Sequence, residues 1–177
     1  GPLDARPQTL SIVIPVYNER ETVGPLLDDV LSKQVLGMRK EVIIVESNSS
    51  DGSREAVAKY GTHPGVRIIW EETPRGKGHA VRHGLTHASG DICLIQDADL
   101  EYDVNDYEGL VKPILQYRGA FILGSRHSGD WKIRHFNDAL LLAGFFNLGH
   151  LLFLWMFNRL YRQRLSDPFT MFKVFRR

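Results

Sequence analysis

The sequence has very little cysteine and no internal repeat, and we expect no secretion signal from its first residues. A single cysteine, Cys93, excludes a disulfide framework and a cysteine-based zinc finger, and the chemistry expected is that of a reducing compartment. With 177 residues, 43% of them hydrophobic, the chain can bury a core without such cross-links. We expect one domain over residues 10–177, preceded by a tag remnant and N-terminal arm over residues 1–9, in a natural chain that continues further.

Charge is nearly balanced over the whole chain, at a net +1, but it is unevenly distributed. Residues 1–125 hold 13 Lys and Arg against 18 Asp and Glu, whereas residues 126–177 hold 9 against 3. The basic residues 126–177 could face phosphates or an anionic membrane surface. The alternative is an ordinary basic surface exposed to solvent. Nucleic acid is not an expected partner.

Short β-branched runs alternate with amphipathic segments along the chain. Strands are expected over residues 10–16, 41–45, 66–70, 91–95 and 120–123, and helices over residues 19–36, 51–60, 77–87 and 107–117. This alternation predicts an α/β fold, a layered and mainly parallel sheet with helices on both faces. Ligands of such sheets bind at the carboxyl ends of the strands. The turns after the first, second and fourth strands are therefore the candidate site.

Residues 139–157 form the most apolar stretch, interrupted only by Asn147 and His150. Its length is marginal for a membrane span, which needs about 20 mostly apolar residues. A buried core helix, a helix lying in a membrane surface and a true membrane span all remain open.

Three carboxylates follow the predicted fourth strand: Asp97, Asp99 and Glu101. At strand spacing these side chains project to the same side, where they repel one another unless a cation lies between them. Oxygen ligands suit Mg²⁺ and Mn²⁺, which commonly bridge to substrate phosphates. The alternative is an acidic loop that begins the next helix.

The Gly-rich turn around Lys77 does not match a P-loop, because Glu71 and Gly78 stand where Gly and Ser or Thr are needed. It does not match a dinucleotide fingerprint either, because Val81 occupies the third Gly position. Lys77 nevertheless begins a predicted helix, where an anion can bind. Glu46, at the end of the second strand, either binds a nucleoside or belongs to an ordinary turn. The seven histidines show no spacing typical of a metal site.

Seven motifs occur in an order that covers almost the whole chain. They are Ile12–Glu19, Ile44–Ser53, Arg75–Ala80, Ala88–Asp91, Asp97–Asp99, Gly124–Arg126 and Asp167–Phe175. Together they resemble a family 2 glycosyltransferase, whose GT-A fold is a Rossmann-like layered sheet. The motifs at Asp97–Glu101 and Gly124–Arg126 resemble the dolichyl- or polyprenyl-phosphate sugar synthases in particular.

The resemblance implies roles for residues by their position in these motifs. It implies donor binding by Pro15, Tyr17, Glu19, Glu46, Lys77, Asp97 and Asp99, and binding of Mg²⁺ or Mn²⁺ by Asp97, Asp99 and Glu101. It implies acceptor or phosphate binding by Arg126, Arg134 and Asp167, with Asp99 and Arg126 as the catalytic residues. Glu46 stands where the family usually has Asp, and Glu101 where the polyprenyl branch commonly has Gln.

The resemblance also implies an inverting transfer of a sugar from a GDP- or UDP-linked donor to a polyprenyl or dolichyl phosphate. Residues 126–164 would then form an acceptor- and membrane-facing region, at the cytoplasmic face of a membrane. A phosphate acceptor is already anionic and needs no general base. The chain indeed lacks the Glu-Asp dipeptide that supplies this base in many hydroxyl-using relatives, and the Gln-x-x-Arg-Trp motif of processive synthases.

Three alternatives to this function remain open. The first is transfer to a hydroxyl of a soluble or cell-surface glycan. The second is a sugar-phosphate nucleotidyltransferase, which shares the layered architecture but normally has a Gly-rich first turn. The third is a non-catalytic, membrane-associated binding domain, against which the intact Asp97 and Asp99 argue.

Overall fold

The computed structural model describes residues 8–117, 119–124, 155–156, 159–160 and 172–177. Residues 1–122 and 171–177 form one compact unit, and residues 123–170 form a second. The predicted site residues Arg126, Arg134 and Asp167 lie outside the described residues. The same holds for all of the apolar stretch 139–157 except Trp155 and Met156.

The first unit is built around a six-stranded sheet with the order β3-β2-β1-β4-β6-β5. Its strands are β1 (Thr9–Val16), β2 (Arg39–Glu46), β3 (Val66–Trp70), β4 (Ile92–Ile95), β5 (Phe121–Leu123) and β6 (Lys173–Arg176). β1 pairs in parallel with β2 and β4, β2 pairs in parallel with β3, and β6 runs antiparallel to β4. The predicted, mainly parallel α/β sheet is confirmed, and β6 is an addition that the sequence pattern did not predict.

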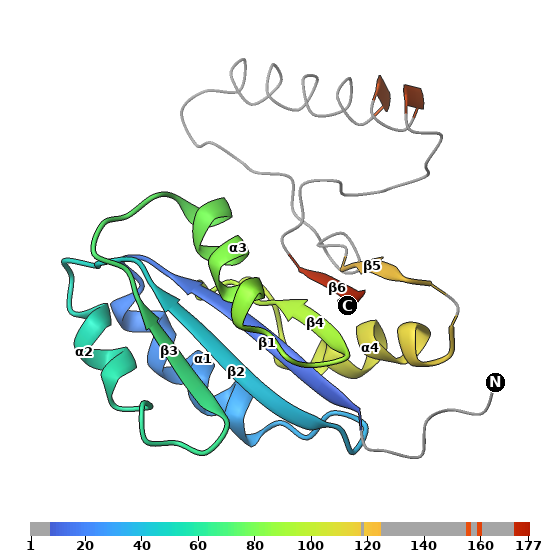
Figure 1. Cartoon of the computed structure of the whole chain (residues 1–177), viewed down its shortest axis with the longest axis horizontal. Helices are drawn as coiled ribbons and strands as arrows, with labels where there is room; N and C mark the ends of the chain where they lie inside the picture. The colour runs from blue at the N-terminus through green and yellow to red at the C-terminus, as the bar shows by residue number, and fades with distance from the viewer. Residues whose placement is uncertain (1–7, 118, 125–154, 157–158, 161–171) are drawn as a thin grey trace, which may run out of the picture. The chain divides into compact units, whose positions relative to one another are not determined.

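Helices cover both faces of this sheet, as predicted (Figure 1). They are α1 (Arg20–Ser32), α2 (Ser53–Ala58), α3 (Lys77–His87) and α4 (Tyr107–Leu115), with a short 3₁₀ turn, η1, at Val104–Asp106. α3 packs on one face, and α1 and α4 on the other. Two hydrophobic layers therefore enclose the strands.

β1 lies between these layers and has buried side chains on both faces. Ile12 and Ile14 pack with the apolar faces of α1 and α4, and Val13 packs with α3. Full burial of each such side chain is worth about 1.5–3 kcal/mol. Gly84 brings α3 close to the sheet, because a Cβ at this position would lie only 2.5 Å from Val13 Cγ1.

α1 ends at Ser32, four residues before the predicted end. The ammonium of Lys40, on β2, donates hydrogen bonds to the carbonyls of Val30, Leu31 and Lys33. These are carbonyls that the end of a helix leaves without a partner. Val35 then turns into the core instead of continuing the helix.

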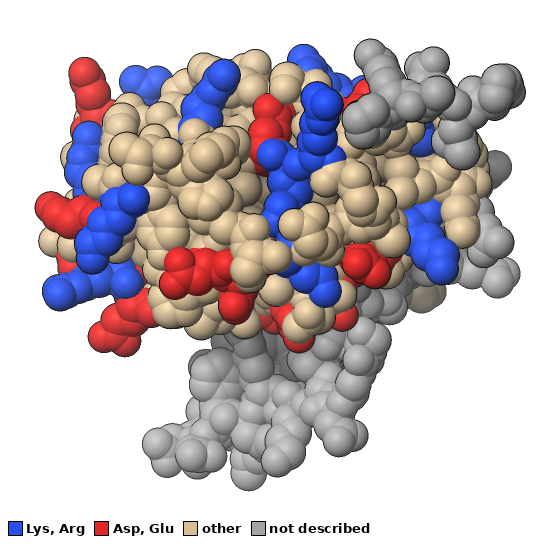
Figure 2. Space-filling view, turned by 90° about the horizontal axis from the view of Figure 1, so that it is seen from below, with Lys and Arg blue, Asp and Glu red and all other residues tan. Residues whose placement is uncertain are grey.

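The described surface of the first unit mixes charges of both signs. Figure 2 shows basic and acidic side chains interspersed on one face rather than gathered by sign. In the second unit, Trp155, Met156 and Leu160 are exposed, Trp155 by 65%. Among the described residues, no helix is both long and apolar enough to cross a membrane.

Candidate functional site

A pocket of about 380 Å³ opens at the carboxyl-end turns of β1, β2 and β4, beside the start of α3. Because β1 pairs with β2 on one side and β4 on the other, parallel strands bring these turns to one edge of the sheet. The pocket is lined by Pro15, Val16, Tyr17, Glu19, Ser47, Pro74, Gly76, Lys77, Asp97, Ala98 and Asp99. It therefore lies where the sequence predicted a ligand site.

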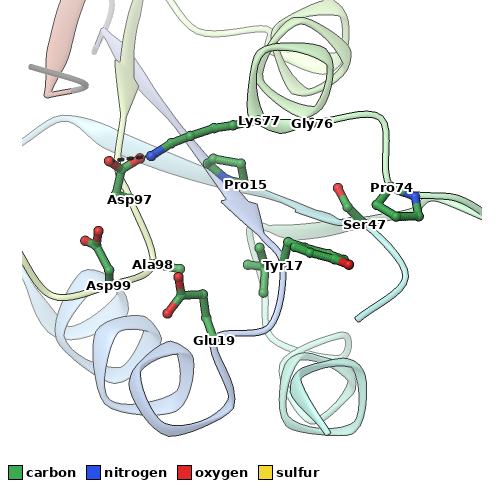
Figure 3. A pocket seen from close by; sticks show the side chains of 11 residues that line it. Pro15, Tyr17, Glu19, Ser47, Pro74, Gly76, Lys77, Asp97, Ala98 and Asp99 are labelled. Atoms are coloured by element: carbon green, nitrogen blue, oxygen red, sulfur yellow. Dashed lines mark ion pairs between the residues drawn. The ribbon is translucent and has the colours of Figure 1, made fainter. Parts of the chain in front are cut away.

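The pocket brings together most of the residues predicted for the donor and the metal. In Figure 3 the carboxylates of Asp97 and Asp99 lie on one side of the cavity. Tyr17, Ser47 and Pro74 lie on the opposite side. Predicted residues among the lining are Pro15, Tyr17, Glu19, Lys77, Asp97 and Asp99, whereas Glu46 and Glu101 are not part of it.

Asp97 is the most buried carboxylate of the pocket, with 4% of its surface exposed. Its Oδ2 lies 2.7 Å from Lys77 Nζ, whereas no described residue donates a hydrogen bond to its buried Oδ1. Burial raises the pKa of Asp97, and the charge of Asp99 adds to this effect while Lys77 opposes it. A buried carboxylate oxygen without a partner is costly, so the donor set fits a bound cation.

Asp99 and Glu101 lie in a turn rather than on an extended strand. β4 ends at Ile95, and Leu100 has a φ of 60°, so the strand alternation used in the prediction stops before these residues. The backbone N–H of Glu101 donates a hydrogen bond of 3.1 Å to Asp99 Oδ1. The turn leaves Asp99 at the pocket and places the exposed Glu101 outside its lining.

The turn between β1 and α1 forms one wall of the pocket. Thr22 donates a hydrogen bond of 3.0 Å to Glu19 Oε2, and the backbone N–H of Glu19 donates one of 2.7 Å to Ser53 Oγ. Asn18, with a φ of 54°, accepts a hydrogen bond of 2.9 Å from the Ser50 N–H. The wall is therefore tied to the neighbouring turn after β2.

The buried side chain of Glu46 stabilises the turn after β2. Its buried carboxylate accepts hydrogen bonds from the backbone N–H groups of Asn48 (3.2 Å) and Ser49 (2.7 Å), and Arg54 Nη1 lies 2.8 Å away. Sequence reasoning missed the adjacent Ser47, which lines the pocket. Its position directly after the second strand was the available signal.

The sequence model of glycosyl transferase family 2 matches residues 11–176. A dolichyl-phosphate beta-glucosyltransferase of Dictyostelium discoideum is 32% identical over 152 residues, which are 77% of this chain and 46% of that enzyme. A mannosyltransferase of Pyrobaculum calidifontis, solved with GDP-Man and Mn²⁺, is 33% identical, with a TM-score of 0.50 over 58% of this chain and 30% of that one.

Another solved structure is similar in fold over a larger part of the chain. Mannosyl-3-phosphoglycerate synthase of Rubrobacter xylanophilus has a TM-score of 0.66 and 22% identity over 96% of this chain and 53% of that one. These likenesses confirm the predicted GT-A fold. The chain spans less than half the length of the first curated relatives that it matches.

Proposed function

Because this chain belongs to glycosyl transferase family 2, we propose that it moves a sugar from a nucleoside-diphosphate sugar to an acceptor with inversion. The observation that carries the proposal is the pocket in which the unpartnered Asp97 Oδ1 lies beside Lys77 and Asp99. A relative of 33% identity was solved with GDP-Man and Mn²⁺, which supports a nucleoside-diphosphate-linked donor.

Asp97 and Asp99 would hold Mg²⁺ or Mn²⁺, with Glu101 as a further carboxylate on the same turn. When bound, such a cation neutralises the negative charge that develops on the leaving diphosphate. Lys77 favours the ionised form of Asp97 and offers a second positive charge at the pocket. Because a related structure contains Mn²⁺, this ion is the first cation to test.

The opposite side of the pocket supplies surfaces for a nucleoside. Pro15, Tyr17 and Pro74 offer apolar contact area, and Ser47 and Glu19 offer polar atoms. Small-molecule pockets commonly combine such apolar walls with a few fixed polar groups. Glu46 contributes by holding the turn that carries Ser47.

For the acceptor, the proposal is a polyprenyl or dolichyl phosphate at the cytoplasmic face of a membrane. The name of the Dictyostelium discoideum relative, the basic residues 126–177 and the absence of a Glu-Asp dipeptide support it. Residues 126–164 would form the acceptor region, with Arg126 as a catalytic residue and with Arg134 and Asp167 near the phosphate. The exposed Trp155, Met156 and Leu160 suit a membrane interface, where apolar side chains meet headgroups.

The donor is tested by thermal unfolding of the chain with GDP- and UDP-linked sugars, with and without Mn²⁺. A ligand that binds the native state raises the melting temperature by mass action, so one donor should stabilise the chain only when Mn²⁺ is present. Asp97→Asn should lose this response. A set of donors that leaves the melting temperature unchanged, with and without Mn²⁺, would overturn the donor-binding proposal.

The acceptor is tested separately with the donor that this screen identifies. Transfer to dolichyl phosphate in vesicles is compared with transfer to soluble glycans that carry free hydroxyl groups. Product in the lipid fraction alone supports the phosphate acceptor. Transfer only to glycan hydroxyls would overturn it while leaving the donor site intact.

A further inference from the structure

A second group of ligating side chains lies at the junction of β3 and α3. Glu71 directly follows β3, and its Oε1 lies 2.9 Å from His79 Nδ1 and 3.0 Å from His83 Nδ1. The three candidate ligand atoms all lie within 4.8 Å of one another. Because His79 and His83 are four residues apart in α3, their rings project from the same helix face.

Glu71 is fixed in place before any ion binds. Its side chain is buried, and its Oε2 accepts a hydrogen bond of 2.7 Å from Ser47 Oγ. Its backbone N–H donates a hydrogen bond of 2.8 Å to the carbonyl of Glu46. Burial raises the pKa of Glu71, but its interactions with Ser47, His83 and His79 outweigh this and lower the pKa below its ordinary value. The same contacts hold the carboxylate in position beside the two imidazoles.

We propose that Glu71, His79 and His83 bind one Zn²⁺ ion. Two imidazole nitrogens and one carboxylate oxygen form a familiar zinc ligand set, with bonds of about 2.0–2.2 Å. Tetrahedral bonds of that length separate neighbouring ligand atoms by about 3.3 Å. The separations of Glu71 Oε1 from the two imidazole nitrogens are 2.9 and 3.0 Å, so each of these must open by only a few tenths of an ångström.

The site has an open side for a fourth ligand. The side chains of His79 and His83 are 33% and 36% exposed, so a water molecule can reach an ion held between them. Three protein ligands with water at the fourth position are common for zinc. Imidazole ligands also favour Zn²⁺ over Mg²⁺ and Mn²⁺, which prefer the oxygen ligands offered by Asp97 and Asp99.

Without an ion, each Nδ1–H donates a hydrogen bond to Glu71 Oε1. Zn²⁺ would replace these hydrogen atoms, and each neutral ring would then carry its proton on Nε2. The ion would also tie both ends of the turn between Glu71 and His79. Pro74 and Gly76 of that turn line the pocket.

The test is a Zn²⁺ titration of the full chain in competition with a chromophoric chelator, with excess Mg²⁺ present to fill oxygen-only sites. We expect one Zn²⁺ per chain and a loss of affinity of about tenfold or more in both His79→Ala and His83→Ala. His87→Ala is the matched control, because His87 follows on the same helix but its Nδ1 contacts the His83 carbonyl. It should bind Zn²⁺ as the wild type does.

An absence of Zn²⁺ uptake by the wild type would overturn the proposal. Wild-type affinity in the doubly substituted His79→Ala/His83→Ala chain would also overturn it. Thermal unfolding without zinc checks that the variants fold. Should they fail to fold, the absorption spectrum of Co²⁺ on the wild type decides. Strong visible absorption bands, typical of Co²⁺ with nitrogen ligands and a low coordination number, would support the site. Weak bands, typical of Co²⁺ with six oxygen ligands, would overturn it.

Discussion

Lys77 Nζ lies 2.7 Å from Asp97 Oδ2, so a lysine at the start of α3 neutralises a buried carboxylate after β4. Lys77→Met keeps the apolar stem but removes the charge. Breaking a buried ion pair costs about 3–5 kcal/mol, whereas exposed pairs are worth about 0–1 kcal/mol. Lys77 is 45% exposed, so we expect an intermediate loss of stability, about 1–3 kcal/mol, in chemical denaturation.

The stability of Lys77→Met should also be measured in the presence of Mn²⁺. A cation bound at Asp97 replaces the missing positive charge, so Mn²⁺ should raise the melting temperature of Lys77→Met more than that of the wild type. Lys59→Met, at an exposed position, is the control and should respond as the wild type does. An equal response in all three chains would contradict a metal role for Asp97.

Asp99→Ala should retain the fold and lose sugar transfer. Asp99 is exposed and supplies the pocket with a carboxylate, so its removal leaves the core unchanged. Asp106→Ala removes another exposed carboxylate from the following segment and should keep wild-type activity. Transfer assays and melting temperatures of both variants check this, and normal turnover in Asp99→Ala would remove it from the catalytic residues.

Glu46→Gln should weaken both donor binding and stability. The substitution removes the charge that the Asn48 and Ser49 amides and Arg54 share, and hydrogen bonds to a charged group are worth about 1.5–3 kcal/mol. Calorimetric donor titration and denaturation measure the two effects. Glu55→Gln, on the exposed side of α2, is the control. Unchanged donor affinity in Glu46→Gln would separate Glu46 from donor binding.

Two glycines of α3 should respond in opposite ways to substitution by alanine. Gly84→Ala gains helix propensity but places a Cβ 2.5 Å from Val13 Cγ1, and overpacking of this kind costs about 1–3 kcal/mol. Gly78→Ala meets nothing within 4 Å and should stabilise the chain by about 0.4–1 kcal/mol. Denaturant midpoints compare them, and a stabilising Gly84→Ala would contradict the close approach of α3 to β1.

Glu41→Gln should destabilise the chain in a pH-dependent way. Burial raises the pKa of Glu41, but hydrogen bonds from Ser11, Ser89 and Gly90 outweigh it and lower the pKa below 4.5. A lowered pKa means that the stabilisation is present above pH 4.5 and is lost as the pH falls through the folded-state value. The gap in unfolding free energy between wild type and variant, about 1–3 kcal/mol at neutral pH, should therefore close in acid.

Local patterns predicted most of the elements. The prediction for α3 agrees with its bounds, because Gly76 interrupts the chain directly before it and the apolar strand β4 begins soon after it. β6 was missed because its four residues form a strand only through antiparallel pairing with β4, a partner distant in sequence. α1 was predicted too long because its end is set by Lys40, which belongs to the next strand.

In the site, too, local patterns predicted single residues, whereas their arrangement depends on parts of the chain that are distant in sequence. Asp97 and Asp99 were identified from their place after an apolar strand, but the strand period could not reveal that the chain turns after Ile95. The spacing of His79 and His83 in a predicted helix was a visible signal that went unused. Their partner Glu71 belongs to the turn before α3, so only the fold brings the three together.

The pairing of β4 with β6 closes a long loop, because the chain passes through residues 123–170 between these two strands. The entropy cost of closing a flexible loop rises only with the logarithm of its length, by about 0.6 kcal/mol for each doubling. A longer chain between β4 and β6 would therefore cost the pairing of these two strands little. Chimaeras that differ only in the length of that connection should accordingly keep the strand order and the pocket at the edge of the sheet.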